Sequence, residues 1–110
     1  MKEKQSESAL VQMRKGMIEF CTMLIIQKGK VYTSDILKQL QSANLLVVEG
    51  TLYPLLSRLK SEQLVEYAWE ESRSGPPRKY YTLTAAGTES LSRSKEAWQE
   101  LTNSINYLLK

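Results

Sequence analysis

Apolar residues at steps of three and four positions mark the first predicted helix, residues 9–28. This spacing is the period of an amphipathic helix, and Lys28 and Gly29 end it. Further apolar residues at positions 23, 25 and 26 widen the stripe. The helix is therefore expected to bury one side in its own core and another against a partner subunit. The repeating positions include Met13, Met17, Phe20, Cys21 and Leu24.

Two more helices are predicted before the middle of the chain. The second begins with an N-cap at Thr33 and ends near residue 43, and the run from Leu45 to Val48 favours a minimal strand. The third has the clearest pattern, because leucines three and four positions apart form one continuous stripe and leave polar groups outside. Pro54 lacks an N–H, so this helix is expected to begin near Thr51 or to kink. The stripe consists of Leu52, Leu55, Leu56 and Leu59.

Alternation then predicts a β-hairpin. Val65, Tyr67 and Trp69 alternate with polar or small residues, which is the two-residue period of a half-buried strand, and residues 79–83 form a second strand. The segment between them, rich in Ser, Gly and Pro, suits a stiff turn. The basic residues that flank this turn are Arg73, Arg78 and Lys79.

After a cap at Thr84, a helix of about 25 residues is predicted to run to residue 110. Its apolar residues repeat about every 3.5 positions, as in the seam of a coiled-coil-like pairing. The alternative is a face packed against the first helix within one subunit, and both arrangements can hold together. The seam residues are Leu91, Trp98, Leu101, Ile105 and Leu108. With Met13, Met17 and Phe20 they form the predicted dimer interface.

Composition narrows the function classes. The 110 residues suit one domain, and the formal charge of +3 permits a polyanionic partner. The chain has no histidine and one cysteine, Cys21, so the commonest general base and most metal-ligand sets are missing. We therefore expect no enzyme activity, no metal and no cofactor. No stretch suits a membrane span and the start does not resemble a signal peptide, which predicts a cytoplasmic protein.

The order helix, helix, minimal strand, helix, hairpin, long helix is that of a winged helix-turn-helix domain, mainly α with a small β-hairpin. We expect a disordered tail over residues 1–7, the winged helix domain over 8–84 and a C-terminal dimerisation helix over 85–110. In this fold the third helix can enter the major groove of DNA while the hairpin reaches the backbone or the minor groove. Side chains suited to such contacts are Thr51, Tyr53, Ser57, Arg58, Arg73, Arg78 and Lys79.

A second function stays open at this point. Glu66, Glu70 and Glu71 dilute the positive charge of the hairpin, so the same fold can instead serve as a protein-interaction module that docks a partner protein. Binding to DNA that falls steeply with salt distinguishes the first function from the second.

Two stretches resemble the PadR family of transcriptional regulators. Residues 49–59, EGTLYPLLSRL, resemble its recognition helix, and residues 72–91, SRSGPPRKYYTLTAAGTESL, resemble its wing and following helix. The resemblance extends over about residues 10–109, and the single C-terminal helix is similar to that of the compact subfamily. It adds Pro54 and Gly75 to the predicted DNA-binding residues, and Thr33 and Ser34 at the start of the second helix complete this set.

The resemblance implies a homodimer held by the first and last helices, which binds operator DNA, usually represses, and is released by a small effector or a stress signal. It also implies an effector pocket for a small planar apolar ligand, lined by Met17, Phe20, Trp98 and Thr102. The alternative is that Trp98 only anchors the dimer interface. Residues 32–36 and Gln63, which stands where Gly is common, depart from the family pattern and affect operator identity more than the fold.

Overall fold

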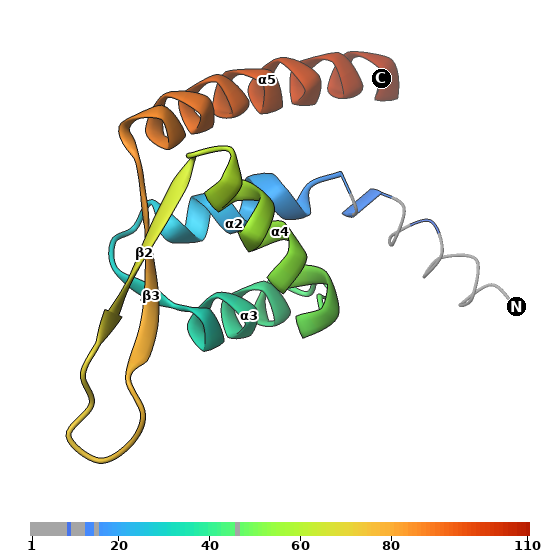
Figure 1. Ribbon diagram of the computed structural model, residues 1–110. Coiled ribbons are helices and arrows are strands. Elements are labelled where there is room, and N and C mark those ends of the chain that lie inside the picture. Colours follow the sequence, from blue (N-terminus) through green and yellow to red (C-terminus); the bar gives the residue numbers. More distant parts are fainter. Residues whose placement is uncertain (1–8, 10–12, 15, 46) are drawn as a thin grey trace, which may run out of the picture.

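The computed structural model describes residues 9, 13–14, 16–45 and 47–110 (Figure 1). Its elements are α2 (Ile18–Ile26), β1 (Val31–Tyr32), α3 (Thr33–Ser42), α4 (Glu49–Ser61), β2 (Val65–Glu70), β3 (Arg78–Leu83) and α5 (Ala85–Leu109). The strands form one antiparallel sheet in the order β1-β3-β2. This arrangement confirms the predicted winged helix-turn-helix fold. The tail predicted over residues 1–7 lies outside the described residues.

The first predicted helix differs from the expected one. Instead of a continuous helix over residues 9–28, the chain turns at Gly16 and Met17, and α2 begins at Ile18. The Met17 N–H donates to the carbonyl oxygen of Arg14 at 2.8 Å. Glycine inside a helix costs about 1 kcal/mol relative to alanine, which favours a break here. Residues 10–12 and 15 of this segment lie outside the described part.

Beside the two hairpin strands, the sheet contains β1 and no strand from the described residues among 45–48, so the strand predicted between Leu45 and Val48 was wrong. The two residues of β1 pair with Tyr81 and Tyr80 of β3. Val47 is 2% exposed and belongs to the core. Val47 and part of Leu45 therefore pack into the core rather than joining the sheet, whereas Val48 is 61% exposed. Residue 46 lies outside the described residues.

Two helices begin at positions slightly different from those predicted. Helix α3 starts at Thr33 itself, so Tyr32 rather than Thr33 occupies the N-cap. Helix α4 starts at Glu49, two residues earlier than predicted, and Pro54 stands inside it with an exposed side chain. Because proline has no N–H, Pro54 cannot donate to the carbonyl of Gly50, one turn earlier.

The leucine stripe of α4 lies at the centre of the core, as predicted. Leu52, Leu56 and Leu59 are 1% exposed or less, and Leu55 is partly buried. Each fully buried leucine stabilises the fold by about 1.5–3 kcal/mol, so this side of α4 is fixed in the body of the protein. The other buried apolar residues are Met23, Ile25, Ile26, Val31, Ile36, Leu40, Val47, Val65, Tyr81 and Leu91.

The hairpin of β2 and β3 extends away from the helical core (Figure 1). Val65, at its base, is buried, whereas Tyr67 is 40% and Trp69 is 63% exposed. The prediction of a half-buried strand was therefore correct only at the base. The outer half of β2 lies beyond the layer of helices, so its side chains have no core to enter.

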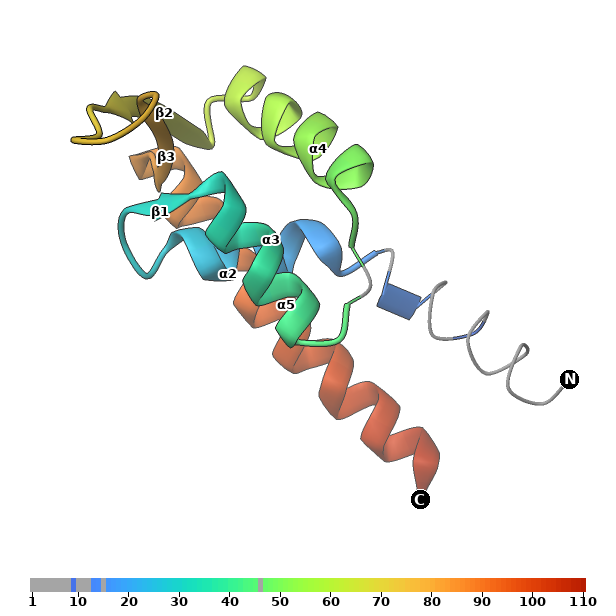
Figure 2. The same cartoon turned by 90° about the horizontal axis from the view of Figure 1, so that it is seen from below.

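Helix α5 is the long last helix that the sequence predicts. The hydroxyl oxygen of Thr84 caps it by accepting a hydrogen bond from the Gly87 N–H at 2.9 Å. The helix lies on the side of the molecule opposite the hairpin tip in Figure 1, and its C-terminal turns extend beyond the other helices in Figure 2. No helix in the described part of the chain has both the length and the apolar character needed to cross a membrane.

Candidate nucleic-acid interface

The exposed side of α4 is divided into two rows. Tyr53, Ser57 and Lys60 stand at i, i+4 and i+7 and share one row, and Thr51 and Arg58, seven residues apart, form the other. All five side chains are exposed. The side of α4 that was predicted to face DNA is thus accessible, but Tyr53 and Arg58 belong to different rows.

Arg58 is held by two carboxylates. Its Nη2 lies 2.9 Å from Oε2 of Glu19 on α2, and its Nη1 lies 3.1 Å from Oε1 of Glu62. Hydrogen bonds to Glu19 and then to Glu62 raise the pKa of the guanidinium above its ordinary value. The sequence predicted Arg58 as a DNA contact, and the structure places it on the flank of α4 that faces α2 with its charge balanced.

Neighbouring strand residues alternate between the two faces of the hairpin. Trp69 stands opposite Lys79, and Glu70 stands opposite Arg78. Arg78 and Lys79, which the sequence grouped as one basic pair, therefore lie on opposite faces. The Lys79 face continues inward to the buried Tyr81 and is the face that packs on the helices.

The other face of the hairpin carries a polar network around Glu70. The Glu70 carboxylate accepts a hydrogen bond from the Tyr32 hydroxyl and lies 2.7 Å from Nζ of Lys30. The Arg78 guanidinium carbon lies 3.7 Å from the centroid of the Tyr32 ring. Hydrogen bonds from Lys30 and Tyr32 lower the pKa of Glu70, and the bond to Glu70 raises the pKa of Tyr32. Part of the positive charge on this face is therefore neutralised within the protein.

The outer part of the Lys79 face carries aromatic rings and lysines. Nζ of Lys79 lies 3.9 Å from the centroid of the Tyr67 ring and 5.9 Å from that of Trp69. Nζ of Lys60 on α4 lies 5.5 Å from the Tyr67 ring, which links the hairpin to α4. We call Lys60, Tyr67, Trp69 and Lys79 the aromatic–basic face. Of these four residues the sequence predicted only Lys79 as a DNA contact, because alternation assigned Tyr67 and Trp69 to the buried side of β2. The spacing of three residues from Ser57 was the signal that places Lys60 on the exposed side of α4.

The remaining predicted DNA contacts lie at the start of α3 and at the tip of the hairpin. Thr33 and Ser34 are the first two residues of α3 and follow β1 directly. Arg73 and Gly75 are exposed in the loop that joins β2 to β3. A Cβ at Gly75 would meet only Ser72 Oγ, at 3.8 Å, so no steric contact requires glycine there. The hairpin tip and α3 lie on the side of the molecule away from α5 (Figure 1).

The apolar stripe of α5 leaves the body of the protein along its length. Leu91 is 2% exposed and belongs to the core, which contradicts its prediction as a dimer-interface residue. A seven-residue period alone does not show which turns of the helix are buried in the core of their own subunit. Trp98 is 46% and Leu108 is 80% exposed further along the helix. Among the described residues of α5 and of the segment before α2, the exposed large apolar ones are Met13, Trp98, Leu101, Ile105, Tyr107, Leu108 and Leu109.

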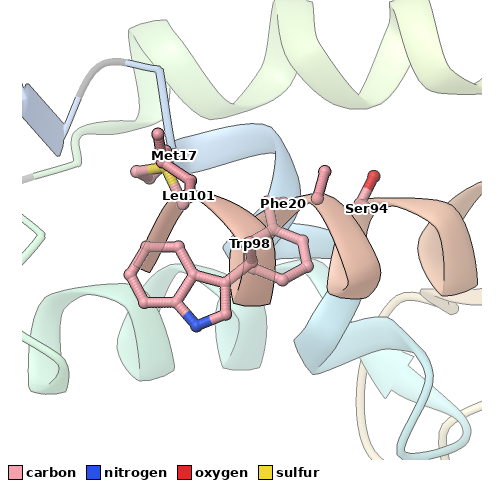
Figure 3. Close-up of a pocket in the computed structure, with 6 residues that line it drawn as sticks. Met17, Phe20, Ser94, Trp98 and Leu101 are labelled. Atoms are coloured by element: carbon pink, nitrogen blue, oxygen red, sulfur yellow. The ribbon is translucent and has the colours of Figure 1, made fainter. Parts of the chain in front are cut away.

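A hollow of about 180 Å³ lies between α5 and the start of α2 (Figure 3). The Phe20 and Trp98 rings are tilted toward each other with centroids 6.4 Å apart. Thr102 does not line the hollow, and its hydroxyl oxygen is buried without a hydrogen-bond partner among the described residues. The structure thus brings together three of the four residues predicted for an effector pocket. The lining residues are Met17, Phe20, Ser94, Ala97, Trp98 and Leu101.

Comparison with known proteins gives a consistent result. A model of the transcriptional regulator PadR-like family matches residues 22–93, a range that includes α3, α4 and the hairpin. A PadR-like transcription factor from Bacteroides fragilis is 52% identical, with a TM-score of 0.76 over 88% of this chain and 94% of that one. A PadR-like regulator from Bacillus cereus is 38% identical, with a TM-score of 0.80 over 90% and 97% of the two chains. A PadR family regulator from Clostridium difficile is 30% identical, with a TM-score of 0.79 over 86% and 99%.

Proposed function

Because the chain belongs to the PadR-like family of transcriptional regulators, we propose that it binds double-stranded operator DNA through α4 and the hairpin and represses transcription as a homodimer. The observation that carries the proposal is the exposed row of Tyr53, Ser57 and Lys60 on a helix whose leucines are buried. Such a helix offers hydroxyl and ammonium groups to the major groove while its other side stays fixed.

The row of Thr51 and Arg58 on α4 contributes to DNA binding once Arg58 exchanges a carboxylate partner for a phosphate. Arg58 is bound to Glu19 and Glu62 in the free protein, and all three side chains are between 42% and 48% exposed. Exposed ion pairs contribute only about 0–1 kcal/mol, so a DNA phosphate can replace one carboxylate at small cost. Thr51 lies on the same row and is suited to bond the same strand of the backbone.

Exposed apolar residues on α5 support the homodimer. Trp98, Leu101 and Ile105 are between 46% and 51% exposed on one side of the helix. An apolar stripe of this kind is typical of a surface that a partner covers. Pairing α5 with its copy, together with Met13, Met17 and Phe20, also presents two copies of α4 to half-sites about one helical turn apart.

The hollow beside Trp98 supports release by a small molecule. Its lining is mostly apolar, and the rings of Phe20 and Trp98 suit a flat apolar effector. If Trp98 instead only anchors the dimer, planar cationic dyes leave its fluorescence unchanged. The family is one of transcription regulators, which points away from an enzyme. The absence of a cofactor and the location in the cytoplasm stay predictions.

Fluorescence anisotropy at several salt concentrations measures how this chain binds duplexes that it selects from genomic DNA. Tyr53→Ala should weaken binding about tenfold, equivalent to ~1.4 kcal/mol, because α4 then offers one hydroxyl and one ring fewer to the groove. Tyr107→Ala is the matched control, since this ring is 77% exposed and stands about half a turn around α5 from Trp98 and Ile105, and its removal should leave DNA affinity unchanged. If the chain binds none of the duplexes but binds a protein with an affinity that does not depend on salt, it is a protein-interaction module instead.

A further inference from the structure

We infer that the aromatic–basic face is the part of the hairpin that binds DNA, and that it holds the sugar-phosphate backbone that runs between α4 and the hairpin. This inference rests on the proposed function and adds a binding surface to it. It places Trp69, Tyr67 and Lys60 among the DNA contacts and assigns the polar network around Glu70 to the structure of the hairpin.

The lysines of this face are available to a phosphate. In the part of the chain that the structure describes, neither Lys60 nor Lys79 is within ion-pair distance of a carboxylate. Their ammonium groups instead lie over the ring of Tyr67, at 5.5 Å and 3.9 Å from its centroid. A cation over an exposed ring gains only about 0.5–1 kcal/mol, so each lysine can turn to a phosphate without leaving a buried charge unpaired.

The opposite face is less suited to DNA. Glu70 lies among its cations, and its carboxylate is bound to Lys30 and to the Tyr32 hydroxyl. Lys30 already has a carboxylate partner at 2.7 Å, and Arg78 lies against the Tyr32 ring. A backbone phosphate on this side would therefore approach a negative charge, whereas on the aromatic–basic face it meets two unbalanced lysines.

The aromatic rings of this face suit contact with the deoxyribose sugars of the DNA backbone. Trp69 is 63% exposed although it is the largest apolar side chain of the hairpin, and Tyr67 is 40% exposed beside it. The Tyr67 ring, between Lys60 and Lys79, and the Trp69 ring, beside Lys79, offer apolar contact to deoxyribose while the two lysines bind neighbouring phosphates. A second copy of this chain fits less well, because pairing two such faces would bring four lysines together without an acid.

The surface is also continuous with the helix proposed to read the DNA. Lys60 belongs to the same row of α4 as Tyr53 and Ser57 and reaches the Tyr67 ring of the hairpin. A strand of DNA whose bases face that row therefore has its backbone beside the aromatic–basic face. The hairpin and α4 then hold one backbone from two sides.

The first experiment compares matched lysines on the two faces. Lys79→Ala should weaken binding to a selected duplex of about 30 base pairs roughly tenfold and lower the salt slope by about 0.9 for each phosphate that the variant no longer neutralises. Lys30→Ala removes the same charge from the opposite face and should change affinity by less than about threefold. Equal losses from both variants, or a larger loss from Lys30→Ala, would overturn the inference.

The second experiment uses the two tryptophans of the chain as reporters. In a Trp98→Phe variant the remaining indole is Trp69, and selected DNA should change its fluorescence and protect it from acrylamide. In a Trp69→Phe variant the same DNA should leave the fluorescence and the acrylamide quenching of Trp98 unchanged. Sedimentation and circular dichroism check that both variants fold and assemble as the unmodified chain does. If Trp98→Phe does not fold, the DNA affinity of Trp69→Ala is the test, and it should be about tenfold weaker than that of the unmodified chain.

The outcomes separate the two proposals. If the unmodified chain binds no DNA, the proposed function fails. If it binds DNA and is weakened by Tyr53→Ala, but Trp69 stays unprotected and Lys79→Ala binds normally, only the inference fails. A fall in self-association on Trp69→Ala would show that a second copy covers this face, which also overturns it.

Discussion

Helices α4 and α5 are both amphipathic, yet they bury their apolar stripes to different extents. On α4, Leu52 and Leu56 are 1% exposed and the outward side is polar. On α5, Leu91 is buried, but Leu101 and Ile105 on the same stripe are 51% and 46% exposed. The difference indicates what each helix offers to a partner. Helix α4 is complete within one subunit and presents polar groups that suit DNA, whereas α5 presents apolar groups that suit another protein surface.

Truncating one leucine on each helix gives the largest expected effect. Leu56→Ala should lower the free energy of unfolding by about 2–5 kcal/mol at every protein concentration, because it leaves a cavity in the core. Leu101→Ala should cost at most about 1 kcal/mol in a dilute protein, because half of this side chain is already exposed, and should lower stability further only at concentrations where the unmodified chain pairs. Urea unfolding over a range of concentrations, together with sedimentation, measures both.

Two results would contradict this comparison. A loss for Leu101→Ala at the lowest concentration as large as the loss for Leu56→Ala would mean that α5 packs within one subunit along its whole length. A sedimentation coefficient of one subunit at all concentrations would remove the homodimer from the proposed function. Either result would leave the position of Leu56 in the core unaffected.

Gly87 lies where the first turn of α5 meets the segment that follows α4. A Cβ on Gly87 would lie 1.9 Å from the carbonyl oxygen of Leu64, and the Thr84 hydroxyl nearby donates to the carbonyl of Gln63 at 2.6 Å. Gly87→Ala should therefore push α5 away from this segment and lower the free energy of unfolding by about 1–3 kcal/mol. Chemical denaturation measures the loss.

The control for this prediction is the glycine of α4. A Cβ at Gly50 meets nothing within 4 Å, so Gly50→Ala should keep or slightly raise stability through its better helix propensity. Equal losses for Gly50→Ala and Gly87→Ala would mean that close approach to Leu64 is not what requires glycine at the start of α5.

The parts of the fold that the sequence predicted are those with local causes. The leucine spacing of α4, the cap at Thr84 and the turn of the hairpin each lie within a few residues. Strand β1 has no such signal, because its two residues become a strand only when β3 lies beside them. The bond between Arg58 and Glu19 joins positions 39 residues apart and depends on the tertiary fold that brings Glu19 of α2 to Arg58 of α4.

The candidate site was predicted less completely than the fold. The exposed positions of Tyr53, Ser57 and Arg58 followed from the helical period alone. The separation of Arg78 and Lys79 onto opposite faces follows from the two-residue period of a strand, yet they were grouped by charge. Periodicity indicates which residues share a face of a helix or strand. Only the packed structure shows how far the core extends along that face.

The ends of α3 and α4 allow the finest comparison. Asn44 and Gln63 both have φ of 62°, the left-handed region, and each follows the last turn of its helix. In both cases the next N–H, that of Leu45 or of Leu64, donates to a carbonyl five residues earlier, at 3.1 Å and 3.0 Å respectively. The two helices therefore close with the same geometry, in which glycine is the usual residue.

Gln63→Gly should raise the free energy of unfolding by about 1 kcal/mol, because a residue with a Cβ is strained at this φ. Asn44→Gly should give a smaller gain, since asparagine tolerates the left-handed region better than glutamine does. The midpoint of urea unfolding should rise for Gln63→Gly with an unchanged slope. A larger gain at Asn44, or a loss at Gln63, would mean that the glutamine side chain stabilises the junction of α4 with the hairpin more than its backbone strain destabilises it.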